Sequence, residues 1–179
     1  MGRNKALIPI EGRPLVSRIV EAALPLTDSV WIAANDAEPY RFLGLPVVAD
    51  AYPDRGPLAG LEAALRAAGR DLMLALACDL PAIRTELLEG LVAAVADWDA
   101  VIPRTEDGRT HPLTAVYRQT CLPRIRAHLE ANLNKVTDIF KDNGLRVRWL
   151  SPAEGGFAAA DLTNLNEPAD LERIARNIW

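Results

Sequence analysis

The predicted fold is decided by the stretch Leu72-Met73-Leu74-Ala75-Leu76-Ala77-Cys78-Asp79-Leu80-Pro81. It begins with an uncharged apolar run of strand length, which is typical of a strand buried on both faces of a parallel sheet. Pro81 has no backbone N–H, so the strand must end before it. Asp79 is therefore predicted to lie at the carboxyl end of the strand, where open α/β sheets bind their ligands.

Two interpretations of Asp79 carry equal weight from the residues alone. An ionised carboxylate beside a buried strand is costly unless a cation or hydrogen-bond donors satisfy it. A Mg²⁺ ion facing a nucleotide would do so. The alternative is a turn or helix N-cap, because a helix is predicted shortly afterwards.

Short apolar runs alternate with amphipathic stretches along the whole chain. This alternation predicts βαβ units, an α/β fold with a mainly parallel sheet, and one domain over residues 1–179. The segment 105–117 is predicted to form an antiparallel hairpin inserted in that plan. Strands are predicted over 30–34, 46–49, 72–78, 100–103, 113–117 and 146–150, and helices over 14–24, 37–43, 57–68, 85–95, 122–130, 136–143 and 169–177.

Polar side chains follow three of the predicted strands. Asn35, Asp50 and Asp79 each come directly after an apolar run. Because the carboxyl ends of parallel strands meet at one edge of a sheet, these side chains are expected to line a common crevice. Lys5 lies in a polar N-terminal stretch, where a lysine serves either as a point charge for phosphates or as a solvated surface residue.

Composition excludes several classes of function. The net charge is −4, and no stretch concentrates Lys and Arg with aromatic residues, so no nucleic-acid partner is predicted. No apolar run reaches the ~20 residues that span a bilayer, and the N-terminus has no signal-peptide pattern. Cys78 is predicted to be a small core residue, and no Cys-x-x-Cys motif suggests zinc or redox chemistry. These features together predict a cytoplasmic protein.

Six short motifs in register carry a resemblance to a known family. In order along the chain they are Met1-Gly2-x-x-Lys5-Ala6-Leu7, Gly12-x-Pro14-Leu15, Gly56-Pro57-Leu58-Ala59-Gly60, Cys78-Asp79-x-Pro81, His111-Pro112-Leu113 and Asn164-x-Asn166-x-Pro168.

With these motifs the chain resembles the molybdenum cofactor guanylyltransferases (MobA-type) of the nucleotidyltransferase superfamily. The resemblance implies a three-layer αβα, Rossmann-like nucleotidyltransferase fold. It implies Mg²⁺-dependent transfer of GMP from GTP to molybdopterin carrying molybdenum, with release of pyrophosphate. Molybdoenzymes or their chaperones are implied as further partners.

The resemblance also implies roles for individual residues. Lys5 matches a lysine that contacts the nucleotide phosphates, and Asp79 matches the Mg²⁺ ligand. Asn35 and Asp50 match nucleotide-binding positions, and a carboxylate suits the N1–H and N2–H₂ donors of guanine. The acceptor end of the site is expected at Asn164, Asn166 and His111. For His111 a purely structural role is favoured by about two to one over acceptor binding.

One departure from the family keeps alternatives open. The family's first strand and glycine-rich phosphate loop would precede Met1, so this chain is expected to lack them and to bind GTP poorly. A start codon assigned too late is the favoured explanation; a shortened chain and a degraded homologue are the others. The rival functions are a nucleotidyltransferase that uses CTP or another small phosphate acceptor, and a catalytically dead domain that binds the cofactor or a partner.

Overall fold

The computed structural model describes residues 4–165, and its centre is a four-stranded mixed sheet in the order β5-β7-β6-β8. The strands are β5 (Leu72–Ala75), β6 (Ala100–Pro103), β7 (Ala115–Arg118) and β8 (Val147–Leu150). β7 runs antiparallel to both of its neighbours, while β6 and β8 are parallel. The pairing of β6 with β7 confirms the predicted antiparallel hairpin.

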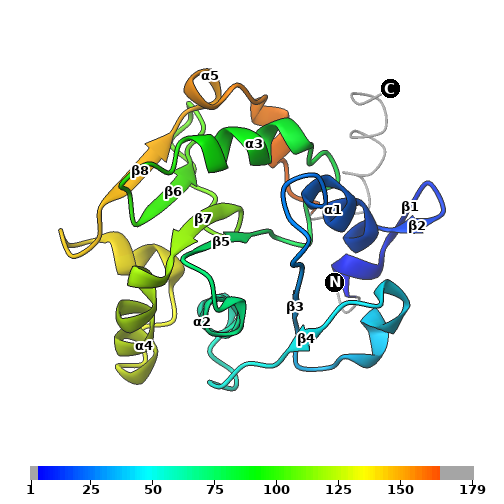
Figure 1. Ribbon diagram of the computed structural model, residues 1–179, viewed down its shortest axis with the longest axis horizontal. Helices are drawn as coiled ribbons and strands as arrows, with labels where there is room; N and C mark the ends of the chain where they lie inside the picture. Colours follow the sequence, from blue (N-terminus) through cyan, green and yellow to red (C-terminus); the bar gives the residue numbers. More distant parts are fainter. Residues whose placement is uncertain (1–3, 166–179) are drawn as a thin grey trace.

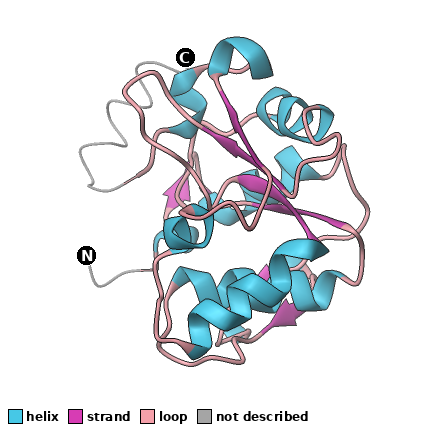
Figure 2. Ribbon diagram, turned by 90° about the vertical axis from the view of Figure 1, so that its left-hand side faces the viewer, coloured by secondary structure: helices cyan, strands magenta, loops and turns pink. Residues whose placement is uncertain are grey.

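Helices cover both faces of this sheet and give three layers (Figures 1 and 2). On one face lie α1 (Leu15–Ala23) and α3 (Thr85–Ala93), and on the other α2 (Pro57–Ala68) and α4 (Leu122–Glu130). The α/β class and the three layers are therefore confirmed. No helix within residues 4–165 is long and apolar enough to span a membrane.

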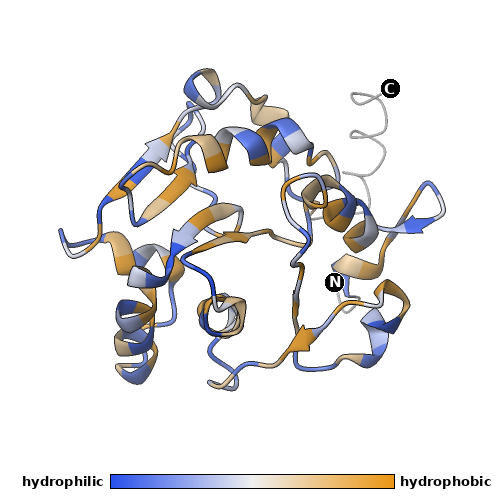
Figure 3. Ribbon diagram, in the orientation of Figure 1, coloured by the Kyte–Doolittle hydropathy of each residue, from blue (hydrophilic) through white to orange (hydrophobic). Residues whose placement is uncertain are grey.

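Alternation along the central strands builds a separate core on each face. In β7, Val116 packs with α1 and α3, while Ala115 and Tyr117 pack with α2 and α4. All four residues of β6 are buried, as expected for a strand with a helix layer on each side. The hydropathy colouring in Figure 3 shows the resulting apolar band along β5 and β6.

A second, smaller sheet lies beside the first and carries the first half of the candidate site. It consists of β3 (Ile32–Ala33) and β4 (Val47–Val48), which are parallel and are connected through the 3-10 helix η2 (Glu38–Leu43). Helix α2 contacts β3, β4 and β5, so the two sheets share one covering helix. A short hairpin of β1 (Pro9–Ile10) and β2 (Arg13–Pro14) leads into α1.

The prediction that 72–78 is a strand buried on both faces is wrong. The strand ends at Ala75, Leu72 is exposed, and the other three residues of β5 are only partly buried. Among residues 4–165, β5 pairs with β7 alone and β3 with β4 alone, so each has one unpaired edge. An edge strand keeps part of its surface accessible, which explains the shallow burial.

The prediction for Cys78 is also wrong, because its side chain is exposed. It lies in the turn after β5 rather than in the strand, so the apolar core does not reach it.

Several predicted elements change type or length. The segments 37–43 and 136–143 form the short 3-10 helices η2 and η4 (Val136–Phe140) rather than α-helices. Sequence reasoning missed the hairpin of β1 and β2 and the short helices η1 (Lys5–Leu7), η3 (Gln119–Cys121), α5 (Pro152–Gly155) and η5 (Ala159–Leu162). The helix predicted over 169–177 lies outside the described residues.

Candidate active site

Asp79 lies at the meeting point of three segments that are far apart in the sequence. Its Oδ2 is 3.6 Å from the Lys5 ammonium and accepts a hydrogen bond from the Asn164 amide at 3.3 Å. Its carbonyl accepts the Leu165 N–H at 2.7 Å. Of the alternative interpretation, the helix N-cap is wrong because Arg84 is the N-cap of α3, whereas the turn is confirmed because Asp79 lies in the turn after β5.

An ion pair between the exposed Arg84 and the buried Asp161 fixes the segment that carries Asn164. Arg84 donates through Nε and Nη2 to the two carboxylate oxygens of Asp161, at 3.0 and 3.1 Å. Asp161 is 3% exposed and also accepts the Ala158 N–H, which closes the turn of η5. Leu162 and Leu165 are buried in the core beside α1 and α3. The segment is thus anchored on both sides of Asn164, which brings its amide to Asp79.

Asn35 and Asp50 form the second part of the candidate site, at the ends of β3 and β4. The Asn35 side chain donates to Oδ2 of Asp50 at 3.2 Å and accepts the Asp50 N–H at 2.9 Å. This reciprocal pair joins the two strand ends and orients the carboxylate. The predicted proximity of Asn35 and Asp50 is confirmed, whereas their proximity to Asp79 stays a prediction.

The start of α2 lies close to the carboxylate of Asp50. Gly56 at the N-cap of α2 has φ +64°, a conformation that side chains rarely adopt, and Pro57 begins the helix. A Cβ added at Gly60 would lie 3.8 Å from Oδ1 of Asp50, which is an ordinary contact. The first turn of α2 therefore borders the second carboxylate oxygen of Asp50 without covering it by a side chain.

His111 is half-buried in the connection between β6 and β7. Its N–H donates to the Pro103 carbonyl at 3.0 Å, and its carbonyl accepts the Thr114 N–H at 2.9 Å. Burial is the main cause that lowers the pKa of His111 below its ordinary value of 6.5, and the charge of Asp79 acts weakly in the opposite direction. The imidazole is therefore neutral at pH 7, and its acceptor-binding role stays a prediction.

Asn166, the remaining predicted acceptor residue, lies outside the described residues. Sequence reasoning missed both the ion pair of Lys5 with Asp79 and the anchor of Arg84 with Asp161. Each joins residues that are more than seventy positions apart, as the 77 positions between Arg84 and Asp161 illustrate. No local spacing could have indicated either pair.

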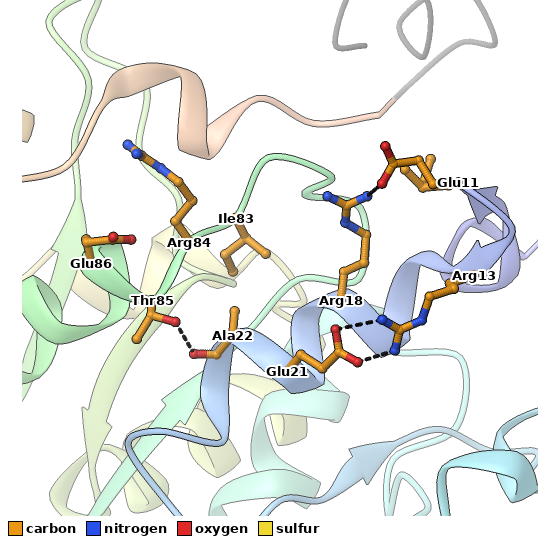
Figure 4. Close-up of a pocket in the computed structure, with 10 residues that line it drawn as sticks. Glu11, Arg13, Arg18, Glu21, Ala22, Ile83, Arg84, Thr85 and Glu86 are labelled. Carbon is orange, nitrogen blue, oxygen red and sulfur yellow. Dashed lines mark hydrogen bonds and ion pairs between the residues drawn. The ribbon is translucent and has the colours of Figure 1, made fainter. Parts of the chain in front are cut away.

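A cavity of about 550 Å³ opens elsewhere, between the hairpin of β1 and β2, α1 and the start of α3 (Figure 4). Its lining includes Arg13, Arg18 and Arg84 but not Asp79. Arg13 is paired with Glu21, Arg18 with Glu11, and Arg84 with Asp161. Because carboxylates already neutralise these guanidinium groups, the cavity does not offer the positive charge that a polyphosphate requires, and the candidate site is placed at Asp79.

The donor set at Asp79 fits a divalent cation that is shared with a substrate. The side chain is 19% exposed, and its Oδ1 accepts no hydrogen bond from the residues that the structure describes. Within residues 4–165 no group of three or more His, Cys, Asp or Glu side chains could cage a metal. Mg²⁺ is commonly held by one or two carboxylates together with phosphate oxygens and waters, and Asp79 supplies such a carboxylate.

Comparison with known proteins identifies the family. The model of the MobA-like NTP transferase domain matches residues 1–149. The chain belongs to this family. It is a nucleotidyltransferase, and nucleotidyltransferases generally use a divalent metal ion.

Two relatives align with almost the whole of this chain. A protein from Carboxydothermus hydrogenoformans named as a probable molybdenum cofactor guanylyltransferase is 32% identical over 177 residues, which cover 98% of this chain and 89% of the relative. The molybdenum cofactor guanylyltransferase of Rhodobacter capsulatus is 35% identical over 179 residues, covering 97% and 87%.

Solved structures support the nucleotidyltransferase fold. The crystal structure of molybdopterin-guanine dinucleotide biosynthesis protein A from Archaeoglobus fulgidus superimposes with a TM-score of 0.80 at 22% identity, covering 98% of this chain and 90% of that one. A cytidylyltransferase from Thermus thermophilus, which acts on 2-C-methyl-D-erythritol 4-phosphate, gives 0.73 at 18% identity, covering 96% and 94%. At these identities both similarities concern the fold alone.

Proposed function

We propose that the protein transfers GMP from GTP to molybdopterin carrying molybdenum, with release of pyrophosphate and with Mg²⁺ bound at Asp79. The observation that carries the proposal is the placement of Asp79 after β5, where it meets the Lys5 ammonium and the Asn164 amide. The names of the relatives from Carboxydothermus and Rhodobacter support the choice of substrates. A cytoplasmic location and delivery to molybdoenzymes or their chaperones belong to the same proposal.

The reaction is a displacement at phosphorus. A terminal phosphate oxygen of molybdopterin attacks the α-phosphorus of GTP, a new P–O bond forms, and the bond to the β-phosphate oxygen breaks as pyrophosphate leaves. Mg²⁺, when bound, neutralises charge on the phosphate oxygens. Catalysis of this kind depends on positioning and charge neutralisation, so no covalent intermediate with the protein is needed.

Each residue of the site has a role that its geometry supports. Asp79 holds the metal, and Lys5 offsets the charge that grows on the leaving phosphates. Asn164 orients the Asp79 carboxylate and borders the acceptor, for which His111 and Asn166 are the further proposed contacts. Asp50, held by Asn35, accepts the N1–H and N2–H₂ donors of guanine.

Base selectivity gives the sharpest test of this proposal. Purified protein is supplied with molybdopterin carrying molybdenum, Mg²⁺ and either GTP or CTP, and the dinucleotide product and pyrophosphate are measured. The proposal predicts product from GTP at least about tenfold faster than from CTP, because the two donors of guanine match one carboxylate.

Asp50→Asn serves as the matched variant in this assay. An amide keeps the size of the side chain but offers only one acceptor oxygen, so the preference for GTP is expected to fall. Faster turnover with CTP in the unaltered protein would contradict the guanine assignment, and turnover with neither nucleotide would contradict the proposed transfer.

A further inference from the structure

We propose that Lys5 acts as a stand-in cation at Asp79, so that the site rejects a bare divalent metal and accepts it together with a nucleotide polyphosphate. The inference rests on the proposed function, since it takes Asp79 as the metal ligand. It adds a binding order to that function: the metal and the triphosphate enter the site as one unit.

The backbone at Lys5 is held in place from both sides. Asn4 caps η1 by accepting the Ala6 N–H at 3.1 Å, and its amide donates to the Tyr40 hydroxyl at 2.9 Å. The Ile8 N–H donates to the Lys5 carbonyl at 3.2 Å, and Ala6 is buried. The starting point of the Lys5 side chain is thus fixed relative to η2 and the core, and its long stem gives the ammonium a range of positions.

Backbone and side-chain contacts also hold Asp79 beside this ammonium. Its carbonyl accepts the Leu165 N–H, and its Oδ2 is shared by the Asn164 amide and the Lys5 ammonium. The anchor of Arg84 with Asp161 prevents the Asn164 segment from drifting. A metal that binds the open Oδ1 of this carboxylate therefore does so beside the Lys5 ammonium.

A metal ion that arrives alone meets an electrostatic penalty. A divalent cation on this carboxylate would lie a few ångströms from the ammonium, and two positive charges at that distance repel each other. One carboxylate cannot neutralise three positive charges. A triphosphate brings the missing negative charge, and its oxygens bind the metal and the ammonium at the same time.

Both partners are accessible enough for this exchange to occur. The side chains of Lys5 and Asp79 are 31% and 19% exposed. The lysine stem can carry its ammonium from the carboxylate to a phosphate oxygen without movement of η1. Removal of the Lys5 charge is therefore expected to change the affinity for the metal alone and for the metal–nucleotide complex in opposite directions.

The test measures binding of Mn²⁺, a paramagnetic substitute for Mg²⁺, by electron paramagnetic resonance without nucleotide. Lys5→Met, which keeps an apolar stem and loses the charge, is expected to bind Mn²⁺ about tenfold more tightly than the unaltered protein. Lys5→Arg keeps the charge and is expected to stay as weak as the unaltered protein. The exposed Lys135→Met serves as a control for a general change in net charge and is expected to have no effect.

Nucleotide is then added to the same variants. With saturating GTP the order is expected to invert, with Lys5→Met binding Mn²⁺·GTP about tenfold more weakly than the unaltered protein. Asp79→Asn in the Lys5→Met background is expected to remove the gained affinity for Mn²⁺ alone. Unchanged or weaker binding of Mn²⁺ alone in Lys5→Met would overturn the inference.

Failure of the inference is distinguishable from failure of the proposed function. If Asp79→Asn does not weaken binding of Mn²⁺·GTP, Asp79 is not the metal ligand, and both the proposed function and the stand-in role of Lys5 are refuted. If Asp79→Asn weakens it but Lys5→Met gains nothing for Mn²⁺ alone, the stand-in role alone is refuted. Should Lys5→Met fail to fold, the unaltered protein decides: Mn²⁺ must bind more tightly with inorganic tripolyphosphate than without it, and equal affinity overturns the inference.

Discussion

Asp79 and Asp99 are both aspartates beside strands of the central sheet, yet they lie in opposite surroundings. β5 and β6 both run antiparallel to β7 and so point in the same direction. Asp79 follows β5 and Asp99 precedes β6. Asp79 therefore lies beyond the carboxyl ends of these strands, and Asp99 lies at their amino ends. The comparison separates a carboxylate that is available to a ligand from one that is used by the fold.

Both carboxylate oxygens and both backbone polar groups of Asp99 form hydrogen bonds within the protein. Oδ1 accepts the Thr120 hydroxyl at 2.7 Å and Oδ2 accepts the Arg146 N–H at 2.8 Å. Its N–H donates to the Arg146 carbonyl and its carbonyl accepts the Arg118 N–H, both at 2.8 Å. These bonds tie β6 to β7, β8 and η3, so Asp99 is a structural junction.

The hydrogen bonds that the carboxylate accepts lower the pKa of Asp99. Burial acts to raise the pKa, but the hydrogen bonds from Thr120 and Arg146 and the charges of Arg146 and Arg118 outweigh it. The pKa of Asp99 therefore lies below its ordinary value of 3.8. Asp79, by contrast, has one oxygen contacted by an ammonium and an amide and another that faces no donor of the described residues.

The largest effect is expected from Asp79→Asn on activity. Loss of the charge removes the metal ligand, and we expect GMP transfer to fall by roughly a thousandfold. The free energy of unfolding should change by less than about 1 kcal/mol, because the amide keeps the size of the side chain and an oxygen that can accept from Asn164. Steady-state kinetics measures the loss of activity, and urea unfolding measures the change in stability. Unaltered turnover in a folded variant would place the metal elsewhere.

The reverse pattern is expected from Asp99→Ala. Removal of the carboxylate leaves the Thr120 hydroxyl and the Arg146 N–H without their acceptor, which should lower the free energy of unfolding by about 2 kcal/mol. The KM for GTP should stay the same, because Asp99 lies at the far edge of the sheet. A large rise in the KM for GTP with unchanged stability would show that Asp99 acts in substrate binding rather than in the fold.

A smaller effect is expected from acid. Because the folded-state pKa of Asp99 is lowered, its contribution to stability is complete above pH 3.8 and is lost as the pH falls through the folded-state value. Unfolding of the unaltered protein and of Asp99→Asn should therefore differ most near pH 7 and converge once the pH falls below the folded-state pKa of Asp99. A difference that stays constant down to that pH would show that Asp99 acts without its charge.

The sequence predicts the strongly periodic elements well. The helices α2 and α4 and the strand β6 have the predicted bounds, because their apolar spacing leaves no other solution with a buried face. That Asp79 comes after a strand also follows from the sequence, but the strand ends at Ala75, well before Pro81 could stop it. For β5 the local pattern predicts deep burial, but burial depends on strand pairing, which an apolar run does not reveal.

The candidate site could be predicted only in part. Asn35 and Asp50 were expected near each other from the parallel order of their strands, and the structure joins them by two hydrogen bonds. The contact of Asp79 with Lys5, however, depends on the path of η1, and its contact with Asn164 on the distant anchor at Asp161. Such contacts arise from tertiary packing and leave no spacing to detect.

The most direct test of the central claim, that the Asp79 carboxylate holds the divalent metal against the nucleotide, is a crystal of the protein grown with Mn²⁺ and GTP. Anomalous scattering then locates the metal independently of any assumed role. The account predicts an anomalous peak at coordination distance, about 2.1 Å, from a carboxylate oxygen of Asp79, with GTP phosphate oxygens on its other side. A peak bound to other residues, with the Asp79 carboxylate still contacted by Lys5 and Asn164 and by no metal, would contradict it.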